Sequence, residues 1–297
     1  MILETTGAAL LAAGAAVGLA RSQYERGHFV TEEMVFYSPK IKKEGVFVFL
    51  SDLHDNEFGR DNRDLLREIE RLKPDAILIG GDTMVIKPRK ASLNNTENLL
   101  HGLSRFWCPI FYANGNHEQR MEKQRDTYGD MYREFKEMLE DYQVIYLQNK
   151  TVNWRDDISI SGMDIGWKYY KDFRTPPMDP KYVERRLGQP DENRFQILMA
   201  HSPLFFDAYA GWGADLSLCG HFHGGTIRLP VLGGVMTPQY QFFKPCCAGT
   251  FEKNDRHMVV SRGLGTHSIN IRIGNFPQLA VIRLKPGKGE DENGDFL

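Results

Sequence analysis

Residues 46–54 read Val-Phe-Val-Phe-Leu-Ser-Asp-Leu-His, an apolar run that ends abruptly in polar side chains. Continuous apolarity over residues 46–50 favours a short strand that is buried on both faces. Asp52 and His54 follow at once and are two residues apart, so an extended chain would point both side chains the same way. A buried strand that delivers an acid and an imidazole at its carboxyl end predicts an α/β fold with a site at that edge.

The same pattern recurs along the chain. Apolar runs over residues 76–79, 109–112, 195–200 and 216–219 are followed by further polar side chains: Asp82, Asn116 and His117, His201, and His221 with His223. Helical spacing of apolar residues predicts helices over 64–72 and 96–105, between the first strands. Beyond residue 140 short strands follow one another, at 144–147, 158–161, 258–261 and 279–284. Successive strands with fewer helices indicate a second sheet packed on the first.

Each of these polar residues alone has a simple structural explanation, as a turn residue or a hydrogen-bonded core histidine. The histidines without a strand-end motif are interpreted in that way: His28, His101, His257 and His267. The others together form a cluster of acids and imidazoles whose burial without a cation would be strongly destabilising. Divalent cations remove that cost. Mixed carboxylate and imidazole ligation suits Mn, Fe or Zn better than Ca or Mg.

The ordered blocks resemble the calcineurin-like metallophosphoesterase superfamily. Its pattern is present as Asp52-Leu53-His54, Gly81-Asp82, Gly115-Asn116-His117-Glu118, His201 and Gly220-His221-Phe222-His223. The complete ordered set is far more specific than any single block. The N-terminal segment and residues 224–230 look most similar to the bacterial branch of phosphodiesterases that includes YkuE- and LpxG-like enzymes.

The resemblance implies an α/β fold of four layers, an α/β/β/α sandwich of two mixed sheets flanked by helices. It also implies that one divalent metal ion takes Asp52, His54 and His223, that a second takes Asn116, His201 and His221, and that Asp82 bridges them. Two metals ~3.5–4 Å apart can share an oxygen, so that a bridging hydroxide attacks phosphorus in line. His117 is the candidate catalytic acid for the leaving group.

Two departures narrow the class. Protein Ser/Thr phosphatases of this superfamily carry an extended GDxxDRG block and an arginine before GNHE, whereas this chain has Val85 and Asn114 at those places. The aspartate that would pair with the catalytic histidine is therefore absent. Protein phosphatase activity is disfavoured, and the sequence identifies no partner that orients His117. Asn114 is either that partner or an ordinary turn residue.

The leading hypothesis is a binuclear-metal phosphoesterase that hydrolyses a phosphodiester or a pyrophosphate-linked substrate. The alternatives are a broad-specificity phosphomonoesterase and a non-catalytic metal-binding scaffold. The formal net charge of −2 gives no strong nucleic-acid signal, and no protein partner is evident. The substrate is expected to be a small phosphate ester, lipid-linked if the N-terminus touches a membrane. Residues 167–189 are expected to overhang the site. Residues 229–251 form either a cleft wall, with Arg228 or Lys244 facing an anion, or a hydrophobic loop packed on the second sheet.

The N-terminus carries an apolar stretch over residues 7–20, followed by Arg21 and Arg26. A spanning helix needs ~20 residues, so this stretch is short for one. Two interpretations remain open: a membrane anchor with the catalytic domain at the cytoplasmic face, which is favoured, or a helix that lies on the domain or on a membrane surface. The alternative location is cytoplasmic. The expected organisation is an N-terminal apolar helix and candidate anchor (1–22), a polar segment (21–44), one metallophosphoesterase domain (45–285) and a disordered acidic tail (286–297).

Overall fold

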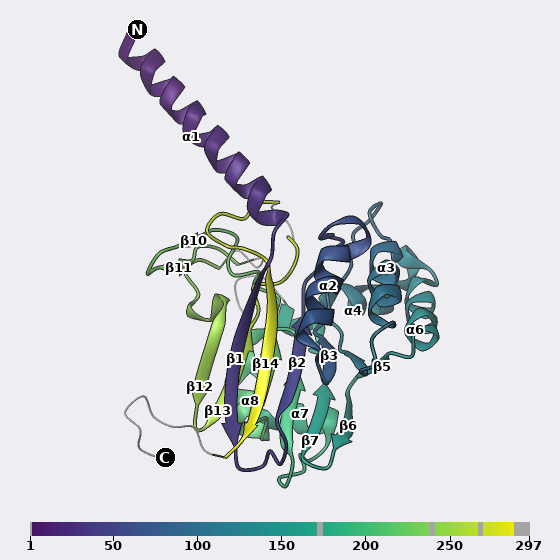
Figure 1. Ribbon diagram of the computed structural model, residues 1–297. Coiled ribbons are helices and arrows are strands. Elements are labelled where there is room, and N and C mark those ends of the chain that lie inside the picture. The colour runs from purple at the N-terminus through teal and green to yellow at the C-terminus, as the bar shows by residue number, and fades with distance from the viewer. Residues whose placement is uncertain (1, 171–174, 238–240, 267–269, 288–297) are drawn as a thin grey trace.

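The computed structural model describes residues 2–170, 175–237, 241–266 and 270–287, with the backbone alone for 2–11 (Figure 1). Its centre is a pair of six-stranded mixed sheets. The first sheet has the order β1 (Val30–Ser38), β14 (Gln278–Pro286), β2 (Gly45–Leu50), β3 (Ala76–Ile79), β4 (Ile110–Tyr112), β5 (Ile145–Tyr146). The second has the order β12 (Gly249–Lys253), β13 (Arg256–Val260), β9 (Leu216–Cys219), β8 (Phe195–Met199), β7 (Ile158–Gly162), β6 (Lys150–Arg155).

The two sheets pack face to face, and β2 shows how the sequence achieves this. Phe47 and Phe49 point into the core between the sheets, where they meet residues of the second sheet such as Ile197. Val48 and Leu50 point the other way, into the core between the first sheet and its helices. Successive side chains of a strand face opposite sides, so a strand covered on both faces must be apolar throughout.

Helices cover both outer faces of the sheet pair. Four pack on the first sheet: α2 (Arg63–Leu72), α3 (Asn94–Leu103), α4 (Asn116–Lys123) and α6 (Met131–Asp141). Two pack on the second: α7 (Pro180–Leu187) and α8 (Phe206–Trp212). The short α5 (Arg125–Tyr128) joins α4 to α6, and β10 (Arg228–Leu229) pairs with β11 (Gly233–Gly234) in a small hairpin. The four-layer α/β/β/α sandwich predicted from the sequence is confirmed.

Besides the small hairpin of β10 and β11, three strands of the two large sheets were absent from the sequence prediction: β1, β6 and β12. All three are edge strands, with one neighbour each. Edge strands expose many side chains to water, so their residues lack the continuous apolarity that identifies a central strand. Residues 21–44, expected to be a polar segment before the domain, contain β1, which pairs with β14 over nine residues and so joins the first sheet ahead of residue 45.

The N-terminal helix α1 (Ile2–Arg26) projects away from the sandwich (Figure 1). The last two turns of the helix contact the domain. Ser22 Oγ accepts a hydrogen bond from the Arg272 amide, and the buried Glu25 carboxylate accepts from the amides of Gly274 and Asn275 at 3.0 and 2.8 Å. No helix among the described residues is long and apolar enough to cross a membrane. Residues 288–297 of the predicted acidic tail lie outside the described residues.

Candidate metal centre

The strand ends bring all seven predicted ligands into one buried cluster. None of the following seven is more than 7% exposed: Asp52, His54, Asp82, Asn116, His201, His221 and His223. The neighbouring His117 is fully buried. The first sheet supplies them from the loops after β2, β3 and β4, and the second sheet from the loops after β8 and β9. The two sheets therefore meet at one edge with their ligand-bearing loops facing each other, as strand-end sites of α/β folds do.

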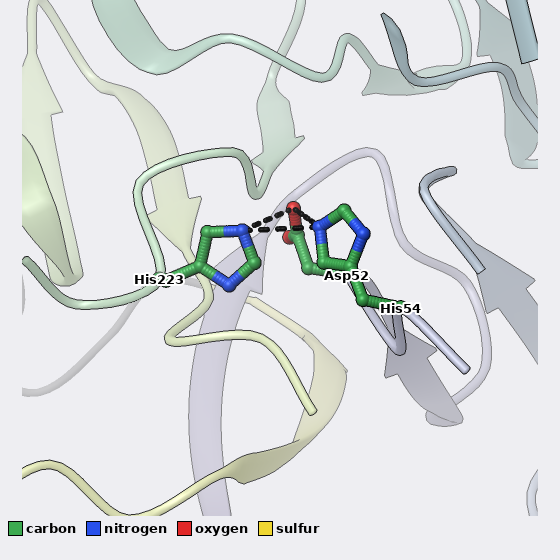
Figure 2. A group of neighbouring side chains, drawn as sticks. All are labelled: Asp52, His54 and His223. Carbon is green, nitrogen blue, oxygen red and sulfur yellow. Dashed lines mark hydrogen bonds and ion pairs between the residues drawn. The ribbon is translucent and has the colours of Figure 1, made fainter. Parts of the chain in front are cut away.

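Asp52, His54 and His223 form the first group of side chains that could hold a metal ion (Figure 2). His54 Nε2 and His223 Nε2 are 3.2 Å apart. Asp52 Oδ1 lies 3.8 Å from His54 Nε2 and 3.4 Å from His223 Nε2. The three ligand atoms thus converge on one point from two separate loops.

Asp82, His201 and His221 form a second such group. His201 Nε2 is 3.1 Å from Asp82 Oδ2, and the same carboxylate oxygen is 3.8 Å from His54 Nε2 in the first group. Asp82 therefore stands between the two groups. Asn116, at the start of α4, has a buried Oδ1 with no hydrogen-bond partner among the described residues.

The spacing of Asp52 and His54 had suggested extended chain, but the ligand loops are not extended. Both residues have left-handed backbones, with φ of 53° and 48°. So do Asp82, His221 and His223. This conformation is uncommon outside glycine and costs free energy, and its concentration here is typical of a functional site held by its surroundings.

Two motif glycines let the loops approach one another. A Cβ at Gly115 would lie 2.2 Å from Asp82 Oδ1, and one at Gly220 would lie 2.1 Å from Asp52 Oδ2. Both distances are far inside van der Waals contact. A side chain at either position would displace a central carboxylate, so the glycines that precede Asn116 and His221 are required by packing.

Backbone groups orient the imidazoles and carboxylates. His201 Nδ1 lies 2.9 Å from the Gly80 carbonyl and His223 Nδ1 lies 3.1 Å from the Gly265 carbonyl. A carbonyl can only accept, so each Nδ1 carries a proton and each Nε2 is the ring nitrogen that faces the cluster. The His221 amide donates to both oxygens of Asp52 at 3.0 Å, and the His117 amide donates to Asp82 at 2.8 Å.

Glu118 organises the site from outside the ligand set, a role that the sequence motif did not reveal. Its carboxylate is fully buried and accepts hydrogen bonds from the amides of Asp82 and Gly115 and from the Tyr112 hydroxyl. It thereby joins the loop after β3 to the loop after β4. Burial, together with the nearby charge of Asp82, raises the pKa of Glu118 to about 7.

A backbone amide orients His117, in place of the missing aspartate. The Ile86 amide donates to His117 Nδ1 at 2.7 Å. Because an N–H can only donate, the proton of the neutral ring lies on Nε2. Asn114 is not the orienting partner, since its side chain donates to Asp164 and accepts from the Tyr146 hydroxyl.

The electrostatics of the cluster fit divalent cations. Burial raises the pKa of Asp52 to about 6. Burial also opposes ionisation of Asp82, yet the nearby imidazoles of His201, His117 and His54 together outweigh it and hold the pKa of Asp82 well below its usual range. Desolvation disfavours the charged form of His201, but Asp82 and Asp52 raise its pKa to about 10. A proton on His201 thus offsets part of the negative charge of the two buried carboxylates, a role that a divalent cation would fill when bound. The Asn116 oxygen, which has no partner among the described residues, offers a further ligand.

Of the two segments expected beside the site, residues 167–189 place a side chain against the ligands, whereas residues 229–251 expose apolar side chains. Of residues 167–189, Tyr170 reaches the cluster: its ring centroid is 5.2 Å from that of His221 and 6.4 Å from that of His201. Arg228 instead donates to the Gly224 carbonyl. Phe242 and Phe243 are exposed at 63% and 53%, so this part of residues 229–251 is not packed on the second sheet.

The histidines without a strand-end motif lie outside these ligand groups. His28 and His101 are hydrogen-bonded, as expected, but they are exposed and not in the core. His257 is partly exposed on β13. His267 lies outside the described residues.

Comparison with known proteins agrees with this geometry. The family profile "Calcineurin-like phosphoesterase" matches residues 45–225, more than half of the chain. The metallophosphoesterase YkuE of Bacillus subtilis (strain 168) is 34% identical over 36% of each chain. The phosphodiesterase YaeI of Escherichia coli (strain K12) is 25% identical over 80% of this chain and 81% of its own.

A further relative is the UDP-2,3-diacylglucosamine pyrophosphatase LpxG of Chlamydia muridarum (strain MoPn / Nigg), which is 23% identical over 80% of this chain and 82% of its own. These relatives are bacterial metallophosphoesterases, as the motifs had indicated. The chain belongs to the calcineurin-like phosphoesterase family and is a metal-dependent hydrolase of phosphate esters.

Proposed function

We propose that this protein hydrolyses a phosphodiester or a pyrophosphate-linked substrate with the help of two divalent cations. The observation that carries the proposal is the pair of buried ligand groups, Asp52–His54–His223 and Asp82–His201–His221, with Asp82 within 3.8 Å of both. When bound, two cations would supply the Lewis acidity that activates water and offsets the charge of the phosphoryl group.

The residues of the chain have separate roles in this proposal. Asp52, His54 and His223 would hold one cation, Asn116, His201 and His221 would hold the other, and Asp82 would be shared between them. His117 presents an N–H from Nε2 and donates it to the leaving oxygen, while the Ile86 amide keeps the ring in place. Mn, Fe and Zn are the metals best suited to this mixture of imidazole and carboxylate ligands.

The names of two relatives support the class of substrate. YaeI is a phosphodiesterase, and LpxG is a pyrophosphatase that acts on UDP-2,3-diacylglucosamine. A broad-specificity phosphomonoesterase is the alternative, because the same metal centre can accept either kind of ester. A non-catalytic scaffold is disfavoured, since every ligand position and the His117 position are filled.

We further propose that α1 associates with a membrane at the cytoplasmic face, which would give a lipid-linked substrate access to the site. Residues 12–17 of α1 are all apolar and all exposed, whereas Ser22 and Glu25 anchor its last turn to the domain. An exposed helix that is apolar on every side loses free energy in water and gains it in lipid.

Replacing the bridging carboxylate tests the two-metal centre. Asp82→Asn should lower the metal content at both sites and reduce kcat/KM on a diester by about 100-fold or more, because the ligand shared by both groups loses its charge. His223→Ala should first lose one equivalent of metal per chain, because His223 belongs to only one of the two ligand groups. Elemental analysis of purified protein, with a panel of mono- and diesters assayed with Mn, measures both effects and ranks the two ester classes. Two retained equivalents in Asp82→Asn would contradict the bridging role.

The leaving group reports on His117. In His117→Ala, hydrolysis of an alkyl ester with a poor leaving group should fall by about 10²–10⁴-fold, while a nitrophenyl ester, which needs little protonation, should lose far less. His101→Ala, at an exposed histidine, is the control and should match the unaltered chain. Equal losses on both esters would count against proton donation by His117.

Cell fractionation tests the role of α1. The unaltered chain should sediment with membranes and be released by detergent, because the apolar residues of α1 are exposed on the protein itself. Leu19→Asp should shift the chain toward the soluble fraction, since a buried charge in lipid is costly. Recovery of the whole unaltered chain in the soluble fraction without detergent would contradict the proposal.

A further inference from the structure

The β10–β11 hairpin exposes an unusual set of apolar side chains. Leu229, Val231 and Leu232 are 42%, 105% and 64% exposed, around a tip that contains Pro230. Phe242 and Phe243 are exposed on the next described segment, where the Phe243 amide donates to the Val235 carbonyl. We call these five residues the end patch. A cluster of large exposed apolar residues on one end of a soluble domain marks an interaction site.

The end patch adjoins α1 through a continuous set of hydrogen bonds. The Arg228 amide of β10 donates to the Ile273 carbonyl at 2.9 Å, and Ile227 forms a bridge with Ile273. The residues on either side of Ile273 are those that bind Ser22 and Glu25 of α1. Figure 1 places β10 and β11 at the end of the sandwich from which α1 projects. The hairpin and the helix therefore belong to one surface.

The chemistry of this surface fits a lipid bilayer better than a protein. Residues 12–17 of α1 are exposed on all sides, whereas a second copy of the chain would cover only one face of a helix. Residues 5–24 and 224–250 contain no Asp or Glu, while Arg21, Arg228 and Lys244 lie among them. Apolar residues with interspersed cations and no acids match an anionic membrane surface.

We propose that the β10–β11 hairpin is a second membrane-contacting element, which inserts its apolar tip into an anionic bilayer beside α1 and turns the metal centre toward the lipid headgroups. The proposal builds on the membrane association of α1 proposed above. His223 is five residues before Arg228, so the hairpin that docks is continuous with a ligand loop. Two contacts, unlike one helix alone, fix the orientation of the domain on the surface, so a phosphate at headgroup depth could enter the site.

Vesicle flotation of the full chain tests the hairpin separately from catalysis. Val231→Asp combined with Leu232→Asp should reduce partition into phosphatidylcholine–phosphatidylglycerol vesicles by about 10-fold or more, because two aliphatic side chains no longer enter the bilayer. Hydrolysis of a soluble nitrophenyl diester and metal content should stay unchanged. Trp107→Ser is the matched control: Trp107 is also 105% exposed but lies at the amino end of β4, away from the ligand loops.

Each other outcome has a distinct meaning. If the unaltered chain does not float, both α1 and the hairpin lose their proposed role. If Leu19→Asp abolishes flotation and the hairpin variant does not weaken it, only the hairpin proposal fails. If the hairpin variant instead dissolves a dimer seen by size-exclusion chromatography, the end patch binds a second copy and the proposal is overturned. If the unaltered chain does not hydrolyse diesters, the proposed function of the metal centre fails, and the membrane proposals are unaffected.

A separate observation concerns Tyr170. Its ring packs against those of His201 and His221, yet its buried hydroxyl has no hydrogen-bond partner among the described residues. The hydroxyls of Tyr112 and Tyr146, which are also near the site, both have partners. An unpaired buried donor beside two ligands indicates that something else accepts from it.

We infer that the Tyr170 hydroxyl donates a hydrogen bond to a non-bridging phosphoryl oxygen of the substrate. This inference rests on the proposed phosphoester hydrolysis at the metal centre. A donor to a non-bridging oxygen stabilises the phosphoryl group itself and is indifferent to the leaving group, whereas His117 acts on the leaving oxygen.

Tyr170→Phe removes the hydroxyl and keeps the ring packing. It should lower kcat/KM by about 10–100-fold on alkyl and nitrophenyl diesters alike, and weaken binding of inorganic vanadate by a similar factor, with unchanged metal content. Tyr169→Phe, at the preceding buried tyrosine, should alter neither quantity. Unchanged vanadate affinity, or a loss of metal, would overturn the direct contact; absence of all hydrolysis by the unaltered chain would overturn the proposed function instead.

Discussion

The structure depends on compensating the charge of two buried carboxylates, Asp52 and Asp82. Both lie at strand ends between the two sheets, where water cannot solvate them, so every loop around them contributes a positive or hydrogen-bonding group. The amides of His221 and His117 donate to them, and three imidazoles approach within 4 Å. The left-handed backbones of the ligand loops and the close approach at Gly115 and Gly220 follow from this demand, because so many polar groups must converge on a small volume.

Arg272 connects this centre to the rest of the molecule. Its fully buried guanidinium donates to the carbonyls of Arg262, Gly263 and Gly265, and the Gly265 carbonyl also accepts from His223. The Arg272 amide is bound by Ser22 of α1, and the side chain of the nearby Asn275 donates to the His223 carbonyl. A ligand loop, the base of α1 and the β10 strand are thus held by one short segment.

The environment of His117 differs from the one expected in the protein Ser/Thr phosphatases of the superfamily. Where protein Ser/Thr phosphatases would place an aspartate, this chain has Val85, and the adjacent Ile86 amide binds the ring from the same loop. The substitution reverses the polarity of the orienting contact, since an amide donates where a carboxylate accepts. Arg120 in turn donates to the Ile86 carbonyl, which ties this loop to α4.

The sequence by itself indicated the buried central strands and the polar residues that follow them, because a strand covered on both faces must be apolar throughout. Its resemblance to a known family implied the sandwich and the seven candidate ligands. It could not identify β1, β6 and β12, whose half-exposed residues resemble loops until β14, β7 and β13 supply their hydrogen bonds. Nor could it show that Ile86 orients His117, that Glu118 ties two loops together, or that Tyr170 reaches His221 from a distant segment. Those contacts join residues far apart in the chain or rely on backbone groups that every residue carries, so only the folded structure decides them.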